Sequence, residues 1–157
     1  MTTDRSREVL VASAHALAHE DDLESTLSTM FRAVARAFGV GSAAIIAGRG
    51  NGARLEVVAS FGLDEKAAAG LSEAIARPTH PIARTFAEPT PTYDVTPVNP
   101  GGPALRTHLP LIVIRHGSET VLGVLALAHE DPIEADDRPI LQAVADLAAV
   151  AIERHAP

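Results

Sequence analysis

The feature that most restricts the possible folds is a hairpin predicted over residues 108–130, HLPLIVIRHGSETVLGVLALAHE. A strand in a sheet with one wet face alternates apolar and polar residues, because successive side chains point to opposite faces. Residues 109–114 and 121–128 are instead apolar at odd and even positions alike. Both faces of this hairpin must therefore be covered. We expect it to turn around Gly117 and Ser118 and to lie in an antiparallel sheet between helical layers.

Apolar side chains at helical spacing predict helices over residues 7–18, 21–39 and 138–155. Asp21 and Glu24 resemble a capping box for the second helix, and Gly39 suits a left-handed stop at its end. A further helix is predicted over residues 64–76, interrupted by Gly70. The segment GNGA at 50–53 predicts the turn of a first hairpin. The predicted buried stripe of the first helix is Val9, Leu10, Ser13, Ala14 and Leu17, and that of the last is Leu141, Val144, Ala148, Ala151 and Ile152.

These elements predict a single α+β domain over residues 1–157. It has a central antiparallel sheet of five or six strands with helices on both faces, in three layers α/β/α. Residues 1–20 form an N-terminal helix, residues 21–155 the core, and residues 78–108 an insert between the two hairpins. Because 46% of the residues are hydrophobic and only 3% aromatic, the core must be aliphatic.

The insert is polar and rich in proline, unlike the rest of the chain. Eight of the 11 prolines lie between Pro78 and Pro110, where they prevent any long helix or central strand. Residues 77–95, RPTHPIARTFAEPTPTYDV, predict a short helix at 81–87 and a short edge strand at 92–95.

The order of these elements resembles that of a GAF domain. The matching stretches are HPIARTFAEPTPTYDV, ALRTHLPLIV and VLGVLALAHEDPIEADDRPILQAVADLAAVAIE, which together span about residues 23–153. The resemblance implies a small-molecule sensing fold with its ligand between one sheet face and the insert. The polar residues of the insert able to point into such a pocket are His80, Arg84, Tyr93, Asp94, Arg106 and His108. We expect them to bind the ligand, alongside apolar side chains.

The sequence departs from several ligand classes of that family. Cyclic-nucleotide binders carry an Asn-Lys pair where this chain has His129 and Glu130, and the absence of cysteine excludes covalent bilins and the family's methionine sulfoxide reductases, which are cysteine enzymes. The family's haem-sensing kinases place an axial histidine a few residues before the Arg-Thr pair, at 101–103, which here reads Gly-Gly-Pro. Haem would need His80 or His108 instead, and we keep it as an alternative.

The net charge and the absence of several motifs limit the partners and activities that we expect. The net charge is −7 and the arginines form no basic stripe, so we expect no nucleic-acid binding. His15 and His19 have a spacing that can hold zinc, but no third ligand is evident, so we predict no metal site. We find no nucleophile elbow and no phosphate-binding lysine, and so expect no enzyme activity. No apolar run reads as a signal core or a membrane span, so we expect a cytoplasmic protein that contacts no membrane.

We therefore predict a non-catalytic sensor or regulatory module of signal transduction that binds a small effector. The effector is expected to be anionic, because His80, Arg84, Arg106 and His108 outnumber the insert's acids. We also expect a homodimer through the terminal helices, and a kinase or transcription regulator as partner. The apolar residues expected at the dimer interface are Val9, Leu17, Leu147 and Val150. The alternative is a degenerate GAF scaffold used only for dimerisation or protein interaction.

Overall fold

The computed structural model describes residues 2–49, 54–97 and 105–155. This part of the chain contains five α-helices, a short 3-10 helix and five strands. The helices are α1 (Thr2–His19), α2 (Leu23–Phe38), α3 (Glu65–Ala74), α4 (Pro81–Ala87), η1 (Ala135–Asp137) and α5 (Arg138–Arg154). The strands are β1 (Val40–Arg49), β2 (Arg54–Phe61), β3 (Thr92–Val95), β4 (Leu105–Arg115) and β5 (Ser118–His129).

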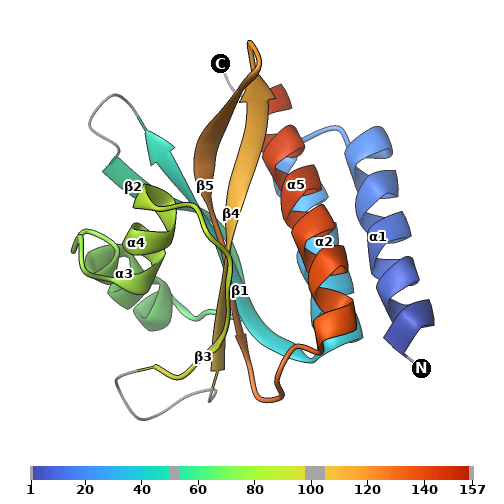
Figure 1. Cartoon of the computed structure of the whole chain (residues 1–157), viewed down its shortest axis with the longest axis horizontal. Helices are drawn as coiled ribbons and strands as arrows, with labels where there is room; N and C mark the ends of the chain where they lie inside the picture. The colour runs from blue at the N-terminus through green and yellow to red at the C-terminus, as the bar shows by residue number, and fades with distance from the viewer. Residues whose placement is uncertain (1, 50–53, 98–104, 156–157) are drawn as a thin grey trace.

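The strands form one antiparallel sheet in the order β2-β1-β5-β4-β3. Helices α3 and α4 cover one face of the sheet, and α2 and α5 cover the other (Figure 1). The α+β fold with helices on both faces is confirmed, and the hairpin β4–β5 lies inside the sheet as its two-sided apolar pattern predicts. Helix α1 adds an outer layer, because it packs on α2 and α5 (Figure 1).

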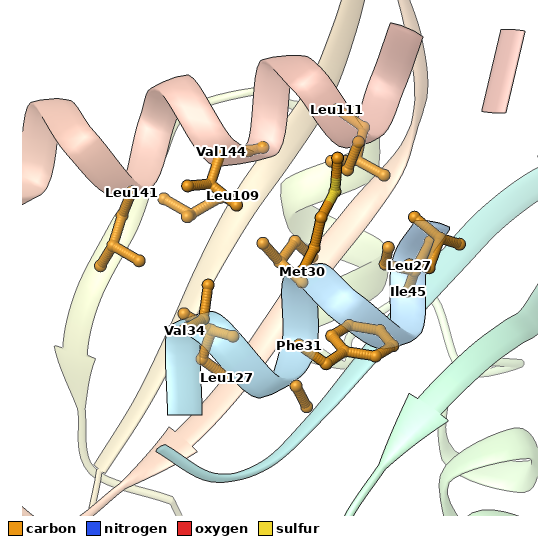
Figure 2. Close-up of a cluster of buried hydrophobic side chains, with 14 of the residues drawn as sticks. Leu27, Met30, Phe31, Val34, Ile45, Leu109, Leu111, Leu127, Leu141 and Val144 are labelled. Atoms are coloured by element: carbon orange, nitrogen blue, oxygen red, sulfur yellow. The ribbon is translucent and has the colours of Figure 1, made fainter. Parts of the chain in front are cut away.

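The larger core lies between the sheet and the α2–α5 pair. Alternate residues of β4 and β5 point into it, among them Leu109, Leu111 and Leu127, each at most 1% exposed. Figure 2 shows these side chains meeting those of α2 and α5, with apolar groups filling the space between them. The helical residues labelled there are Leu27, Met30, Phe31, Val34, Leu141 and Val144.

Several local predictions are corrected. The N-cap of α2 is Asp22, whose Oδ1 accepts from Ser25 N at 2.7 Å, and not Asp21. Helix α3 continues through Gly70 without interruption. The β4–β5 turn is His116–Gly117, with φ of 52° and 79°, so Ser118 already belongs to β5. Two residues with positive φ make the type I′ turn that suits a two-residue hairpin. The predicted turn at 50–53 lies outside the described residues.

Helix α1 buries a narrow, mostly small-residue face consisting of Ser6, Val9, Ser13 and Ala16. Ala14, predicted on that face, is exposed. Hydrogen bonds tie α1 to η1 and to α5: Ser6 Oγ donates to Oδ1 of Asp137 in η1 at 2.7 Å, and Arg154 Nη1 of α5 donates to the Leu17 carbonyl at 2.7 Å. Val9 is only 1% exposed within the chain itself, so the expectation that it serves a dimer interface is wrong.

No helix in the described ranges combines the length and the apolar character needed to cross a membrane.

Candidate ligand-binding site

A cavity of about 540 Å³ lies between the sheet and helices α3 and α4. Its walls come from four places: the sheet face, the inner side of α3, the start of α4, and the end of β3. The lining side chains that matter for its chemistry are Ser42, Ala44, Leu63, Leu71, His80, Ile82, Val95, Arg106, His108, Ala126 and Ala128.

The cavity exists because the floor side chains are small. Strand register places Ala128 between Ser42 on β1 and Arg106 on β4, and it places Ala126 between Ala44 and His108. Neighbouring residues in such rows point to the same face of the sheet. Ala44 of β1 and Ala126 and Ala128 of β5 thus contribute methyl groups where leucine side chains would fill the space. Arg106 and His108 enter the cavity from β4, His80 enters from the start of α4, and Ser42 lies on β1.

Helix α4 brings His80 to the cavity. Pro81 occupies the first helical turn, where its missing N–H costs nothing. His80 is the N-cap, and its Nδ1 accepts from Ile82 N at 3.1 Å. That hydrogen bond requires an unprotonated Nδ1, so a neutral His80 carries its proton on Nε2. Ile82, at 3% exposed, anchors α4 in a small core with Ile46 and Val124.

Burial determines the protonation states of the ionisable side chains in the cavity. It lowers the pKa of His108 to about 4, with the neighbouring His80 and Arg106 lowering it further. Burial is also the main cause of a lowered pKa at His80, with Arg77 adding to it. Burial lowers the pKa of Arg106 too, yet a guanidinium stays protonated in proteins. At neutral pH the cavity therefore presents one cation flanked by two neutral imidazoles.

Hydrogen bonds orient these groups. His108 Nδ1 lies 3.4 Å from Thr92 Oγ1, on the neighbouring strand β3. Arg106 Nη1 donates to the Leu105 carbonyl at 3.3 Å. A guanidinium has five N–H donors in a fixed fork, so it can hold a backbone carbonyl and a second acceptor together.

Helix α3 is a wall of the cavity that is held by few buried contacts. None of its residues is buried, although Ala67, Gly70, Leu71 and Ala74 face the cavity. Asp64 caps it, with Oδ1 accepting from Ala67 N at 2.7 Å. Few buried contacts mean a low cost of local displacement. The wall opposite the polar end is therefore apolar and can move.

Three of the six residues predicted to bind the ligand line this cavity: His80, Arg106 and His108. The structure places the other three elsewhere. Arg84 is on α4 and exposed. Tyr93 packs against the α2–α5 core, where its hydroxyl donates to the Arg138 carbonyl at 3.4 Å and its ring lies 4.5 Å below the Arg138 guanidinium.

Asp94 also lies on the α5 side of the sheet. Its Oδ1 accepts from Ile133 N at 2.8 Å, and its Oδ2 lies 3.5 Å from Arg138 Nη2. The reason is a bulge, because Thr92 pairs with His108 and Val95 with Arg106, so three steps along β3 match two along β4. Asp94 absorbs the extra residue with a φ of 57°. Simple alternation cannot predict this, although aspartate tolerates the left-handed region better than most residues.

Sequence reasoning also missed the residues that make the space. The signal was present: Ala126 and Ala128 alternate with Leu125 and Leu127 on β5, so one face of that strand is small and the other large. A second omission is a buried network on the α5 face. Thr107 Oγ1 lies 2.8 Å from His129 Nε2, and His129 Nδ1 lies 2.7 Å from the Asp131 carbonyl.

The described surface also has hollows elsewhere. One, of about 430 Å³, lies between α1 and α2 and is lined by Arg5, Glu8 and Arg36. Another, of about 690 Å³, lies beside the edge strand β2, near Phe86. Neither contains a buried ionisable side chain, whereas His108 in the cavity under α3 is 4% exposed. His15 and His19 stack at 4.3 Å, and no cluster of three metal-ligating side chains occurs among the described residues.

Comparison with known proteins identifies the fold. The family model of the GAF domain matches residues 22–154. The GAF domain of a phosphoenolpyruvate-protein phosphotransferase from Coxiella burnetii is similar at a TM-score of 0.77 and 14% identity, over 96% of this chain and 94% of that one. That of a putative sensor histidine kinase from Pseudomonas syringae pv. tomato gives 0.68 and 18%, over 97% and 89%.

A free methionine-R-sulfoxide reductase from Neisseria meningitidis is also similar, at a TM-score of 0.70 and 17% identity over 94% of this chain and 88% of that one. No curated protein matches the chain. GAF domains are commonly sensory or regulatory modules of signalling proteins and are generally non-catalytic, although this reductase is an enzyme. The match over residues 22–154 covers most of the chain, which belongs to the GAF domain family.

Proposed function

We propose that this domain is a non-catalytic sensor module that binds a small anionic effector in the cavity under α3. The observation that carries the proposal is the cavity itself, with a methyl-lined floor and Arg106, His108 and His80 at one end. Ligand pockets combine apolar walls with a few convergent polar groups in this way. The cation of Arg106 favours an anion in a chain of net charge −7, whose surface otherwise repels one.

The response to the effector is a population shift. A ligand that contacts α3 and the end of β3 favours the conformations in which those walls are closed. Val95 and Thr96 line the cavity, and the adjacent Asp94 holds Ile133 and Arg138 on the opposite side of the sheet. Asp137, next to Arg138, accepts from Ser6 of α1. The closed walls are thereby linked to the first turn of α5 and to α1, which would carry the signal to a kinase or transcription regulator.

The test is a thermal-shift screen of small anions and neutral metabolites, followed by calorimetric titration of every compound that stabilises the protein. Arg106→Ala should weaken the binding of a true cavity ligand. Arg84→Ala is the matched control, because Arg84 is exposed and outside the cavity. Ala126→Leu should fill the floor and abolish binding. Ligands that bind Ala126→Leu as well as the wild type would show that the cavity is not the site.

A dimerisation scaffold is the second candidate, supported by exposed apolar residues on the outer helices. Val11 on α1 is 62% exposed and Val150 on α5 is 43% exposed. Exposed apolar side chains are often covered at interfaces, and a symmetric copy could cover both helices. We expect a dimer by light scattering at tens of micromolar, and monomers for Val150→Glu. A monomeric wild type would eliminate the scaffold function and leave the sensor function intact.

Haem is the remaining alternative, and the two cavity histidines are its candidate ligands. Both rings already use Nδ1 within the fold, at Ile82 N and Thr92 Oγ1. Iron would therefore have to be ligated through Nε2 of His80 or His108. The predicted result is that haemin titration produces no stoichiometric Soret band. A band that is lost in His80→Ala or His108→Ala would replace the anion proposal with a haem sensor.

A further inference from the structure

The lining of the cavity under α3 is divided into two chemically different halves. The polar half holds the ionisable side chains Arg106, His108 and His80, and Ser42 and Thr96 add neutral hydroxyls to the lining. The apolar half consists of the inner side of α3 and the alanine floor: Ala44, Leu63, Ala67, Gly70, Leu71, Ala74 and Ala126. Among the described residues that line the cavity, none is acidic. A ligand that satisfies both halves must have a charged head and an apolar body.

The head should carry a single negative charge. Arg106 is the one formal cation among the described lining residues at neutral pH, because burial keeps His80 and His108 uncharged. A phosphate dianion would require a second cation or a row of backbone N–H groups. The first turn of α4 cannot provide that row, since His80 Nδ1 already accepts from Ile82 N at 3.1 Å.

The donors match a planar head. A guanidinium presents parallel N–H groups that pair with both oxygens of a carboxylate. His80 has its proton on Nε2 when Nδ1 accepts from Ile82 N, so it can donate from a second direction. Thr92 Oγ1 lies 3.4 Å from His108 Nδ1 and orients that ring. Uncharged imidazole donors add direction without adding charge.

The body should be a ring or a short branched chain. The floor residues Ala44, Ala126 and Ala128 contribute methyl groups from adjacent strands, which form an apolar surface. Leu63 and Leu71 lie over them from the side of α3. A cavity of about 540 Å³ has room for a single ring with its carboxylate, and α3, without one buried residue, can settle onto it.

We propose that the effector is an amphipathic monocarboxylate, with its carboxylate on Arg106 beside His80 and His108 and an aromatic or branched body on the alanine floor under α3. This inference rests on the proposed sensor function and specifies its ligand. It predicts that charge and body are both required, and that neither a bare carboxylate nor a neutral ring is sufficient.

The experiment compares matched probes by calorimetric titration at pH 7 on the intact protein. Benzoate and cyclohexanecarboxylate combine head and body. Benzamide keeps the ring and removes the charge, acetate keeps the charge and removes the body, and phenyl phosphate keeps the ring and doubles the charge. We expect benzoate or cyclohexanecarboxylate to bind at least tenfold more tightly than each of the other three.

Variants then test which half of the cavity holds the carboxylate and which holds the apolar body. Arg106→Ala should weaken benzoate binding by about ten- to a hundredfold, the usual effect of losing one charged hydrogen bond. Arg84→Ala should leave it unchanged. Ala126→Leu should abolish benzoate binding and have little effect on any residual acetate binding. Circular dichroism and melting temperature establish that each variant is folded.

The outcomes separate this inference from the function on which it rests. If benzamide binds as well as benzoate, or phenyl phosphate binds more tightly, the monocarboxylate inference is overturned while a cavity ligand remains. Acetate equal to benzoate would overturn the need for an apolar body. If no probe binds, and the wider screen finds no compound sensitive to Ala126→Leu, the sensor function fails as well.

Discussion

The two faces of the sheet are made by the same strands and differ in almost every physical respect. On β5, Leu125 and Leu127 point toward α2 and α5, where they enter a large, closely packed core. Ala126 and Ala128 point the other way, toward α3 and α4, and leave a cavity. On the first side, the hollow beside Leu125 and Leu127 holds about 10 Å³, against about 540 Å³ for the cavity on the second side.

This difference shows how one sheet can serve stability and binding at once. Interiors packed at crystal-like density tolerate little change in volume. The α2–α5 face therefore fixes the strands, and with them the positions of Arg106 and His108. The α3–α4 face contributes less to folding, and its helix α3, which has no buried residue, can adapt to a ligand. Four predictions test this division, beginning with the largest expected effect.

The first compares the same substitution on the two faces. Leu109 is 0% exposed in the α2–α5 core, whereas Leu71 on α3 is only partly buried. Leu109→Ala should lower the free energy of unfolding by about 2–5 kcal/mol, the usual range for a buried leucine. Leu71→Ala should cost about 1 kcal/mol, because less surface is lost and α3 can relax. Urea unfolding followed by circular dichroism measures both. Equal costs would contradict the division of labour.

The second concerns the pH dependence of folding, which the buried His108 should dominate on the cavity face. Its pKa is about 4 when folded, while an unfolded histidine has an ordinary value of about 6.5. Between these values the unfolded chain binds more protons, so stability rises with pH across this window. The contribution is fully present above about pH 6.5 and is lost as the pH falls toward 4.

That gap corresponds to about 3 kcal/mol, at about 1.4 kcal/mol for each tenfold change in proton affinity. The wild type should lose about this much more stability than His108→Gln when the pH falls from 7 to 4, as measured by urea unfolding. The groups acting on His108 are His80 and Arg106, both of which oppose its protonation. His15→Gln is the control, because His15 is exposed on α1. Parallel profiles of wild type and His108→Gln would refute the prediction.

The third prediction separates neighbours in sequence that belong to opposite faces. Asp94→Ala removes the acceptor of Ile133 N and the partner of Arg138, and should lower stability by about 1–3 kcal/mol. It should leave the affinity of a cavity ligand within about threefold, a change worth less than 1 kcal/mol. Arg106→Ala should do the reverse. Melting curves and titrations on both variants check this, and a large loss of affinity in Asp94→Ala would return Asp94 to the binding site.

Much of this architecture could be predicted from residue patterns. The two-sided apolar run of β4–β5 required a covered sheet, and the stripe of Leu141, Val144 and Ala148 required a helix against it. The short helix predicted at 81–87 is also confirmed, because α4 spans Pro81–Ala87. These features are local, so a short window of sequence is enough to recognise them.

The site was only partly predictable, because it depends on strand register and on space. The sequence identified His80, Arg106 and His108, which line the cavity. It misplaced Tyr93, which follows the cavity-side Thr92 and therefore points to the opposite face, and Asp94, which a bulge turns toward α5. It did not identify Ala126, because alanine carries no reactive group and contributes to the cavity only by being small. Whether a cavity forms depends on side chains that only the fold brings together.

The fourth prediction has the smallest effect and addresses the mobility of α3. Gly70 lies inside this helix, and a Cβ added there would have no atom within 4 Å. Glycine in a helix interior is less favourable than alanine by about 0.5–1 kcal/mol, because the unfolded chain gains freedom from it. Gly70→Ala should raise the free energy of unfolding by about that amount.

Gly48→Ala is the matched control on β1. A Cβ there would lie 2.5 Å from the ring of Phe86, which must shift, so this variant should be destabilised. If α3 is the movable wall, stiffening it with Gly70→Ala should also slow hydrogen exchange of the α3 amides while leaving those of α5 unchanged. Equal slowing in both helices would mean that the two faces open together. The cavity wall would then not move independently of the core.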